Sequence, residues 1–134
     1  MKSQVSVSTV ENFQVLVRTG SHGWLADEPP AVGGDGLGPN PFDQLLGSLG
    51  SCIAVTVVNL AARAKVPLAR LWIDLEGEPA EDAGSGRYRI VARIRVRGEL
   101  SDRDVERLGR YAEQCPVHRI LSAGAAVEMR VERV

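Results

Sequence analysis

Two cysteines and two histidines are the residues of this 134-residue chain whose types suggest chemistry. Two cysteines are too few for a disulfide scaffold or a four-ligand zinc site. His22 and His118 lack a third ligand, so we expect them at the surface or at helix caps and expect no metal site. Thiol chemistry at Cys52 and Cys115 is therefore the chemistry to consider.

A long helix is predicted to carry Cys52. Apolar residues recur at steps of three and four over residues 45–64, which indicates a helix that begins near Pro41 and ends before Pro67. Cys52 lies on its most apolar stripe, and no charged residue occurs between Gln44 and Ala62. A helix that is apolar on nearly all sides is expected to be buried at the centre of the fold.

A second helix is predicted to carry Cys115. Ser101 and Asp104 form the capping-box pattern of a helix start. Four apolar residues after it share one face of the predicted helix: Val105, Leu108, Ala112 and Cys115. Pro116 interrupts this helix, and residues 117–122 are compatible with a short continuation. Since both apolar faces must meet one core, the two thiols can approach each other. Spacing alone is equally compatible with two inert, buried cysteines, whereas a reactive pair in a reducing compartment points to catalysis or redox sensing.

Alternating apolar residues predict the strands. Two or three short strands fall within residues 5–26, two more cover residues 71–78 and 88–97, and the last covers residues 127–131. A loop rich in glycine and proline over residues 29–41 separates the first group from the long helix. This loop lacks the Gly-Lys-Ser/Thr of a P-loop, so we interpret it as a flexible connector.

A row of arginines follows one face of residues 87–97. In a hairpin it would stand beside Asp74, Glu76 and Glu78, so we interpret it as a set of cross-strand ion pairs. A net charge of −1 and 4% aromatic residues also argue against a nucleic-acid partner.

The composition, 44% hydrophobic and 25% charged, fits one soluble domain over residues 1–134. No apolar run approaches the roughly 18 residues of a membrane-spanning helix. Residues 1–14 lack the apolar segment of a signal peptide. We therefore expect a cytoplasmic protein without a membrane partner.

Two separate motifs resemble those of the OsmC/Ohr family, the osmotically inducible and organic hydroperoxide resistance proteins. Residues 38–46 (GPNPFDQLL) with 50–52 (GSC) resemble the family's first-cysteine helix, and residues 114–119 (QCPVHR) resemble its second-cysteine motif. Residues 26–29 (ADEP) with Gly33 and Gly34 are similar to the OsmC-like branch. The resemblance implies an α+β fold in which antiparallel sheets wrap around two central helices of an intertwined homodimer.

The family's enzymes are thiol peroxidases without a cofactor, so the resemblance implies a cysteine-based organic hydroperoxide reductase. Cys52 would attack the hydroperoxide and become a sulfenic acid, and Cys115 would condense with it to a disulfide. An external dithiol would then reduce that disulfide. Apolar surroundings of Cys52 would favour organic hydroperoxides over hydrogen peroxide.

One position departs from the family pattern. Burial raises the pKa of a thiol, and family peroxidases hold the thiolate with an arginine that is itself held by a glutamate after the helix-start proline. Here that position is Phe42, and Asp43 follows it. Asp43 precedes Cys52 by nine residues, about 13.5 Å of helix, so it would have to act in another way. Arg18 is the best candidate for the activating arginine.

Two other interpretations remain open. The same fold could hold a small apolar or thiol-reactive ligand without turnover, and the Phe42 departure motivates this alternative. A structural dimer with inert cysteines is the other. A depressed thiol pKa at Cys52 separates catalysis from binding, and native thiol labelling separates both from the inert dimer.

Overall fold

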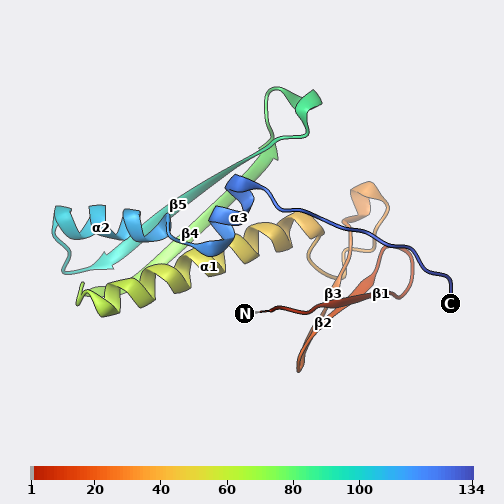
Figure 1. Ribbon diagram of the computed structural model, residues 1–134, viewed down its shortest axis with the longest axis horizontal. Coiled ribbons are helices and arrows are strands. Elements are labelled where there is room, and N and C mark those ends of the chain that lie inside the picture. The colour runs from red at the N-terminus through yellow and green to blue at the C-terminus, as the bar shows by residue number, and fades with distance from the viewer. Residues whose placement is uncertain (1) are drawn as a thin grey trace. The chain divides into compact units, whose positions relative to one another are not determined.

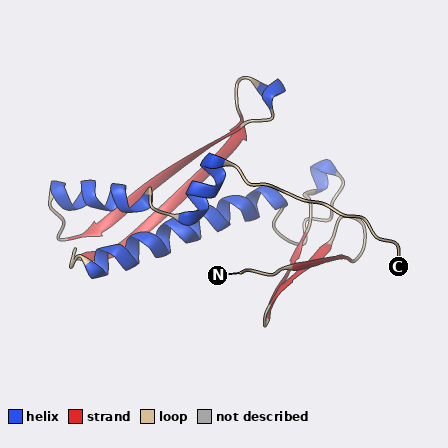
Figure 2. Ribbon diagram, in the orientation of Figure 1, coloured by secondary structure: helices blue, strands red, loops and turns tan. Residues whose placement is uncertain are grey.

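The structure is a computed structural model that describes residues 2–134; Met1 of the predicted 1–134 domain lies outside them. The chain divides into two compact units, residues up to Gly47 and residues from Ser48 onward. Its described part combines α-helices with two antiparallel sheets (Figure 1, Figure 2). The predicted mixed α+β class is confirmed, and the single-domain assignment stays a prediction.

The first unit contains a three-stranded antiparallel sheet in the order β1-β2-β3. Its strands are β1 (Ser6–Thr9), β2 (Val15–Thr19) and β3 (His22–Ala26). Val17 is buried and pairs with Val7 on one side and Trp24 on the other, so these three share one face. The Trp24 indole Nε1–H donates to Gln44 Oε1 over 2.8 Å. The alternation in residues 5–26 thus predicted these strands correctly.

The loop after β3 is organised around the buried carboxylate of Asp27, which is 2% exposed. Asp27 accepts backbone N–H groups from Glu28 (2.8 Å), Asp35 (3.2 Å) and Leu37 (3.1 Å). Burial raises the pKa of Asp27, but these bonds and one from the Gly36 amide lower it by more, so the pKa lies below its usual value. The loop, which includes the 3₁₀ turn Pro30–Val32, is therefore tied down rather than a flexible connector.

Helix α1 (Pro41–Arg63) follows the predicted bounds. Asn40 Oδ1 accepts the backbone N–H of Asp43 over 2.8 Å and caps the first turn, with Pro41 in the first helical position. The buried residues form one stripe: Leu49, Gly50, Ile53, Val57 and Ala61. This stripe contributes most of the buried core of the second unit.

The opposite face of α1 is open in the single chain. Val55 is 69% exposed and Val58 53% exposed, so the expectation of a helix buried on all sides is wrong for one chain. By length and composition α1 is also apolar enough to cross a membrane, against the expectation that no such run exists. Its glycines, serines and threonine interrupt the apolar run in the sequence but lower the mean hydropathy little. The core helix of a soluble protein meets the same criterion of length and apolar composition, and α1 has the buried stripe of a core helix.

Strands β4 (Leu68–Pro79) and β5 (Tyr88–Gly98) pair antiparallel, and α1 runs along them (Figure 1). The 3₁₀ turn Ala83–Ser85 lies between the two strands. The inner face packs on the core with alternate residues of each strand: Leu71, Ile73, Leu75, Ile90, Ile94 and Val96. On the outer face Arg95 pairs with Asp74 (3.0 Å) and Arg89 with Glu78 (3.2 Å). These two of the predicted cross-strand ion pairs are confirmed.

Helices α2 (Asp102–Ala112) and α3 (Pro116–Ala123) complete the second unit. The capping box of Ser101 and Asp104 is present, and Leu108 is buried as predicted. Val105 is 47% exposed, so its assignment to the buried face is wrong. Its neighbours Asp102, Arg103 and Glu106 are exposed as well, so this side of α2 faces solvent in the single chain.

The predicted final strand over residues 127–131 is also wrong for the single chain. Residues 124–134, all of which the structure describes, form no strand. Val127, Met129 and Val131 are exposed. Alternation shows that a segment suits a half-covered sheet, but it cannot supply the neighbouring strand that completes the hydrogen bonds.

Candidate functional site

The two thiols lie together in the core of the second unit. Cys52 is in the middle of α1 and is half-buried, and Cys115 is fully buried between α2 and α3. Both are free cysteines, and their side chains are hydrogen-bonded to each other. Cys115 belongs to the buried cluster with Ile53 and Leu108, and Cys52 packs against that cluster. The prediction that the second helix carries Cys115 on its apolar face is wrong: α2 ends at Ala112, because Pro116 cannot continue it, and Cys115 is the N-cap of α3. Its burial in the shared core still brings it to Cys52 of α1.

The surroundings of Cys52 favour its thiolate. Burial raises the pKa of the Cys52 thiol, but a hydrogen bond from the Cys115 thiol opposes it. Two further hydrogen bonds, from the Val117 backbone N–H and the Thr56 side chain, lower the pKa as well. The pKa of Cys52 therefore lies below the ordinary thiol value. The groups that lower the pKa of Cys52 are thus neutral hydrogen-bond donors.

The surroundings of Cys115 favour its protonated form. Burial and the hydrogen bond with Cys52 raise the pKa of the Cys115 thiol, and the negative charge on Cys52 adds to this. Cys115 is also the N-cap of α3, where its Sγ accepts the backbone N–H of His118 over 3.4 Å. That bond and one with Val117 lower the pKa by less, so it stays above the ordinary value.

The pair is chemically asymmetric as a result. Cys52 combines partial exposure with a lowered pKa, which suits a nucleophile. Cys115 combines full burial with a raised pKa and a hydrogen bond to the first sulfur, which suits a second thiol that reacts only with its neighbour. This arrangement can form and break a disulfide.

Three predicted residues lie in the first unit. Arg18 is exposed on β2, and Asp43 is in the first turn of α1 with its backbone N–H bonded to Asn40. Phe42, which replaces the family's glutamate, is 58% exposed. Activation of Cys52 by Arg18 and any contribution of Asp43 stay predictions. His22 and His118 are exposed, as predicted.

Sequence reasoning missed two of the groups around Cys52. Thr56 lies one helical turn after Cys52, and this spacing was a usable signal for a side-chain donor to the thiol. The Val117 N–H is a backbone group, and the signal for it was Pro116, which suits the first position of a helix whose free amides then face the thiols.

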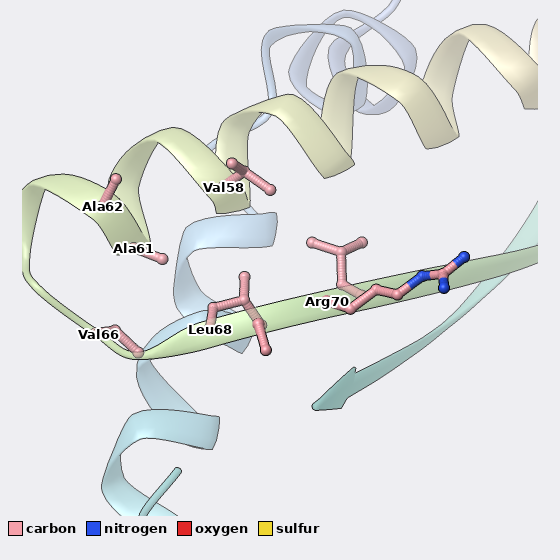
Figure 3. Close-up of a pocket in the computed structure, with 8 residues that line it drawn as sticks. Val58, Ala61, Ala62, Val66, Leu68 and Arg70 are labelled. Atoms are coloured by element: carbon pink, nitrogen blue, oxygen red, sulfur yellow. The ribbon is translucent and has the colours of Figure 1, made fainter. Parts of the chain in front are cut away.

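A cavity lies elsewhere in the second unit. It has a volume of about 170 Å³ and is lined by residues of α1, the turn after it and the start of β4: Val58, Ala61, Ala62, Val66, Leu68, Ala69, Arg70 and Leu71 (Figure 3). Neither cysteine lines it. No group of three metal-binding side chains gathers anywhere in residues 2–134. The expectation of a cofactor-free, metal-free site stays a prediction.

Comparison with known families matches residues 33–130 to the family described as OsmC-like protein. The chain belongs to the OsmC-like family. An OsmC-like protein of Mycoplasma pneumoniae superposes with a TM-score of 0.77 at 20% identity, covering 91% of this chain and 88% of that one. Comparison with curated proteins gives no significant match.

Two solved structures of this fold carry functional descriptions. A Legionella pneumophila protein described as an organic hydroperoxide resistance protein OsmC has a TM-score of 0.69 at 17% identity, covering 90% of this chain and 89% of that one. The organic hydroperoxide resistance protein OhrB of Bacillus subtilis has a TM-score of 0.62 at 17% identity, covering 89% of each chain. These likenesses confirm the predicted OsmC-like fold, and the family match confirms the predicted family. The homodimer stays a prediction.

Proposed function

We propose that this OsmC-like protein is a thiol peroxidase that reduces organic hydroperoxides, with Cys52 as the attacking thiol and Cys115 as the resolving thiol. The observation that carries the proposal is the hydrogen-bonded thiol pair, in which the half-buried Cys52 has the lowered pKa and the buried Cys115 the raised one. The family membership and the descriptions of its structural neighbours support the substrate class.

The reaction proceeds in three balanced steps. The Cys52 thiolate attacks the hydroperoxide O–O bond and becomes a sulfenic acid, and the released alkoxide takes a proton to form the alcohol. The Cys115 thiol then attacks the sulfenic sulfur, which forms the disulfide and releases water. An external dithiol reduces the disulfide by thiol exchange and is itself oxidised to a disulfide. One hydroperoxide and one dithiol thus give one alcohol, one water and one oxidised dithiol.

The surroundings of Cys52 support an organic rather than an inorganic peroxide. Cys52 packs against a buried cluster made mainly of aliphatic side chains. Burying apolar area contributes about 25 cal/mol per Å² to binding, and only a substrate with a hydrocarbon group gains it. We expect a lower KM for cumene or tert-butyl hydroperoxide than for hydrogen peroxide.

Consumption of an organic hydroperoxide in the presence of dithiothreitol tests the proposal. Cys52→Ser abolishes turnover, because no nucleophile remains. In a single turnover without dithiothreitol, Cys115→Ser reduces one equivalent of peroxide per chain and stays a sulfenic acid, whereas the wild type forms the disulfide. Turnover that persists in Cys52→Ser, or a wild-type chain that consumes no peroxide, contradicts the proposal.

A binding module of the same fold is the second candidate, and the Phe42 departure favours it. The two candidates differ in the reactivity of Cys52. A module that only holds an apolar ligand needs no thiolate, so its Cys52 alkylates with the pH profile of an unperturbed thiol. An alkylation profile displaced to lower pH favours the peroxidase. We expect this result, because the surroundings of Cys52 lower the pKa of its thiol.

We also infer a homodimer. The open apolar face of α1 with Val55 and Val58, and the unpaired segment of residues 124–134, both leave apolar side chains exposed in one chain. Covering these surfaces with a second copy would stabilise them. We expect a dimeric mass by light scattering, and a monomer for Val55→Asp/Val58→Asp. Val91→Asp, on the outer face of β5, is the matched control and keeps the dimer; equal masses for both variants contradict the inference.

A further inference from the structure

The outer face of the β4–β5 pair carries a cluster that the redox chemistry does not use. Trp72 is surrounded by three guanidinium groups, whose Cζ atoms lie 5.0 Å (Arg70), 4.9 Å (Arg97) and 5.9 Å (Arg95) from its ring centroid. All three arginines are exposed, and Trp72 is half-buried. Such distances are those of cation–π contacts, which hold each guanidinium against the indole.

The charges of this cluster are only partly balanced. Arg95 pairs with Asp74 over 3.0 Å. Arg70 and Arg97 make no ion pair with any residue that the structure describes. They are also cross-strand partners in the β4–β5 register. Like charges directly opposite each other destabilise a sheet, so this pair is an unfavourable arrangement that a bound anion would relieve.

The contact with Trp72 leaves the hydrogen-bonding edges of the two arginines available. A guanidinium stacked on a ring keeps its N–H donors in its own plane, where they can form bidentate bonds with an oxyanion. Arg70 also points away from the other residues of the nearby cavity, along β4 (Figure 3). The indole therefore pre-organises two forked donors on an exposed surface.

We propose that Arg70 and Arg97, held by Trp72, form a binding site for a phosphate group. A phosphate monoester carries close to two negative charges at neutral pH, which matches two unpaired arginines, and its oxygens accept several N–H bonds at once. Glu76 and Glu78 lie farther along the same face and would repel a long polyanion. The site therefore suits one phosphate, either free or as a lipid headgroup, rather than a nucleic-acid strand.

This site is separate from the thiol pair. Trp72 and its arginines lie on the outer face of the sheet, whereas Leu71 and Ile73 of the inner face pack on the cluster that contains Cys115. The inference therefore goes beyond the peroxidase proposal. Its test measures binding, which can succeed or fail whatever the peroxide assay gives.

Calorimetric titration of the full chain with inorganic phosphate and with pyrophosphate tests the site. We expect saturable binding of one anion per chain, weakened about tenfold for each guanidinium removed in Arg70→Ala/Arg97→Ala. Arg87→Ala/Arg89→Ala is the matched control, since it removes the same charge from two exposed arginines that are already ion-paired, one in β5 and one just before it. We expect it to change the affinity less than about threefold, through long-range charge alone.

Two further arms separate the chemistry and the source of the phosphate. Arg70→Lys/Arg97→Lys keeps the charge but not the fork, and we expect it to bind as weakly as the alanine variant. Cosedimentation with phosphatidylcholine vesicles, with and without phosphatidic acid, tests the lipid source. Binding to phosphatidic acid vesicles alone supports a headgroup ligand, and binding of soluble phosphate supports a free one.

A change in Trp72 emission in a Trp24→Phe background provides a direct signature, because the ligand approaches the guanidiniums that contact this ring. Three results overturn the proposal. They are no saturable binding in any arm, an equal loss of affinity in the Arg87→Ala/Arg89→Ala control, and undiminished binding by the lysine variant.

Discussion

Replacing Thr56 by valine tests how Cys52 is activated. The Thr56 side chain hydrogen-bonds the Cys52 sulfur and is one of three groups that lower the pKa of that thiol. Valine is β-branched like threonine and keeps the helix geometry of α1, so the substitution chiefly removes the hydroxyl. Without this donor the thiolate is less favoured, and the pKa of Cys52 rises.

The size of the effect follows from the bond that is lost. A hydrogen bond to a charged group contributes about 1.5–3 kcal/mol, and about 1.4 kcal/mol corresponds to a tenfold change in an equilibrium. Cys52 is half-buried and solvent weakens the bond, so the lower end of this range applies. At pH values below the pKa, where the thiolate population limits the rate, we expect alkylation of Cys52 to slow about tenfold.

The assay is the pH dependence of iodoacetamide alkylation, followed by mass spectrometry of the peptide that contains Cys52. The wild-type and Thr56→Val profiles should converge at high pH, where the thiol is ionised in both. Thr56→Ser is the matched control, since it keeps the hydroxyl, and its profile should stay close to that of the wild type. Superimposed wild-type and Thr56→Val profiles would refute the reasoning, and an equal displacement in Thr56→Ser would assign the effect to packing.

Three further predictions concern stability. Asp27→Asn lowers the midpoint of urea unfolding at pH 7, because the folded pKa of Asp27 is below its unfolded value of about 3.9. The stability that the Asp27 carboxylate contributes is present above pH 4 and is lost as the pH falls through the folded pKa, so the midpoints of wild type and variant should converge in acid. Leu108→Ala, at a buried site, costs about 2–5 kcal/mol of unfolding free energy, whereas the exposed Val105→Ala costs under about 1 kcal/mol; equal midpoints would contradict this. Gly50→Ala places a Cβ 2.7 Å from Leu75 Cδ1, so this side chain must shift, and the overpacking of about 1–2 kcal/mol exceeds the helix gain of alanine and lowers the stability. Gly109→Ala, in open space within α2, adds about 0.5–1 kcal/mol; thermal unfolding checks both signs.

The elements of this fold could be predicted where local patterns decide them. Periodicity and two prolines set the bounds of α1, and the pattern of Ser101 and Asp104 set the start of α2. The strand predicted over residues 127–131 is absent, because a strand needs a neighbouring strand for its hydrogen bonds and the sequence of one segment does not show whether that neighbour exists. The prediction that α1 is buried on all sides was wrong for a related reason. An apolar face indicates that something must cover it, but it does not identify the covering segment or chain.

Part of the candidate site could also be predicted from the sequence, and part could not. That Cys52 and Cys115 lie together in one core was predicted correctly, but Cys115 reaches it from the turn between α2 and α3 and not from a helix face. The groups that favour the Cys52 thiolate were not predicted, because one is the backbone amide of Val117 and another is Thr56, whose hydroxyl lies on an otherwise apolar helix. We expected a cation beside the thiolate, whereas neutral donors of the second unit lower the pKa of Cys52.

The two tryptophans of this chain fall one in each compact unit. Trp24 donates its indole N–H to Gln44 in the first unit, and Trp72 lies among the guanidiniums of the second. Each single-tryptophan variant, Trp24→Phe or Trp72→Phe, thus has an optical reporter confined to one unit. Coincident denaturation curves from the two variants would mean that both units melt in a single cooperative transition, and separated curves would give each unit a stability of its own.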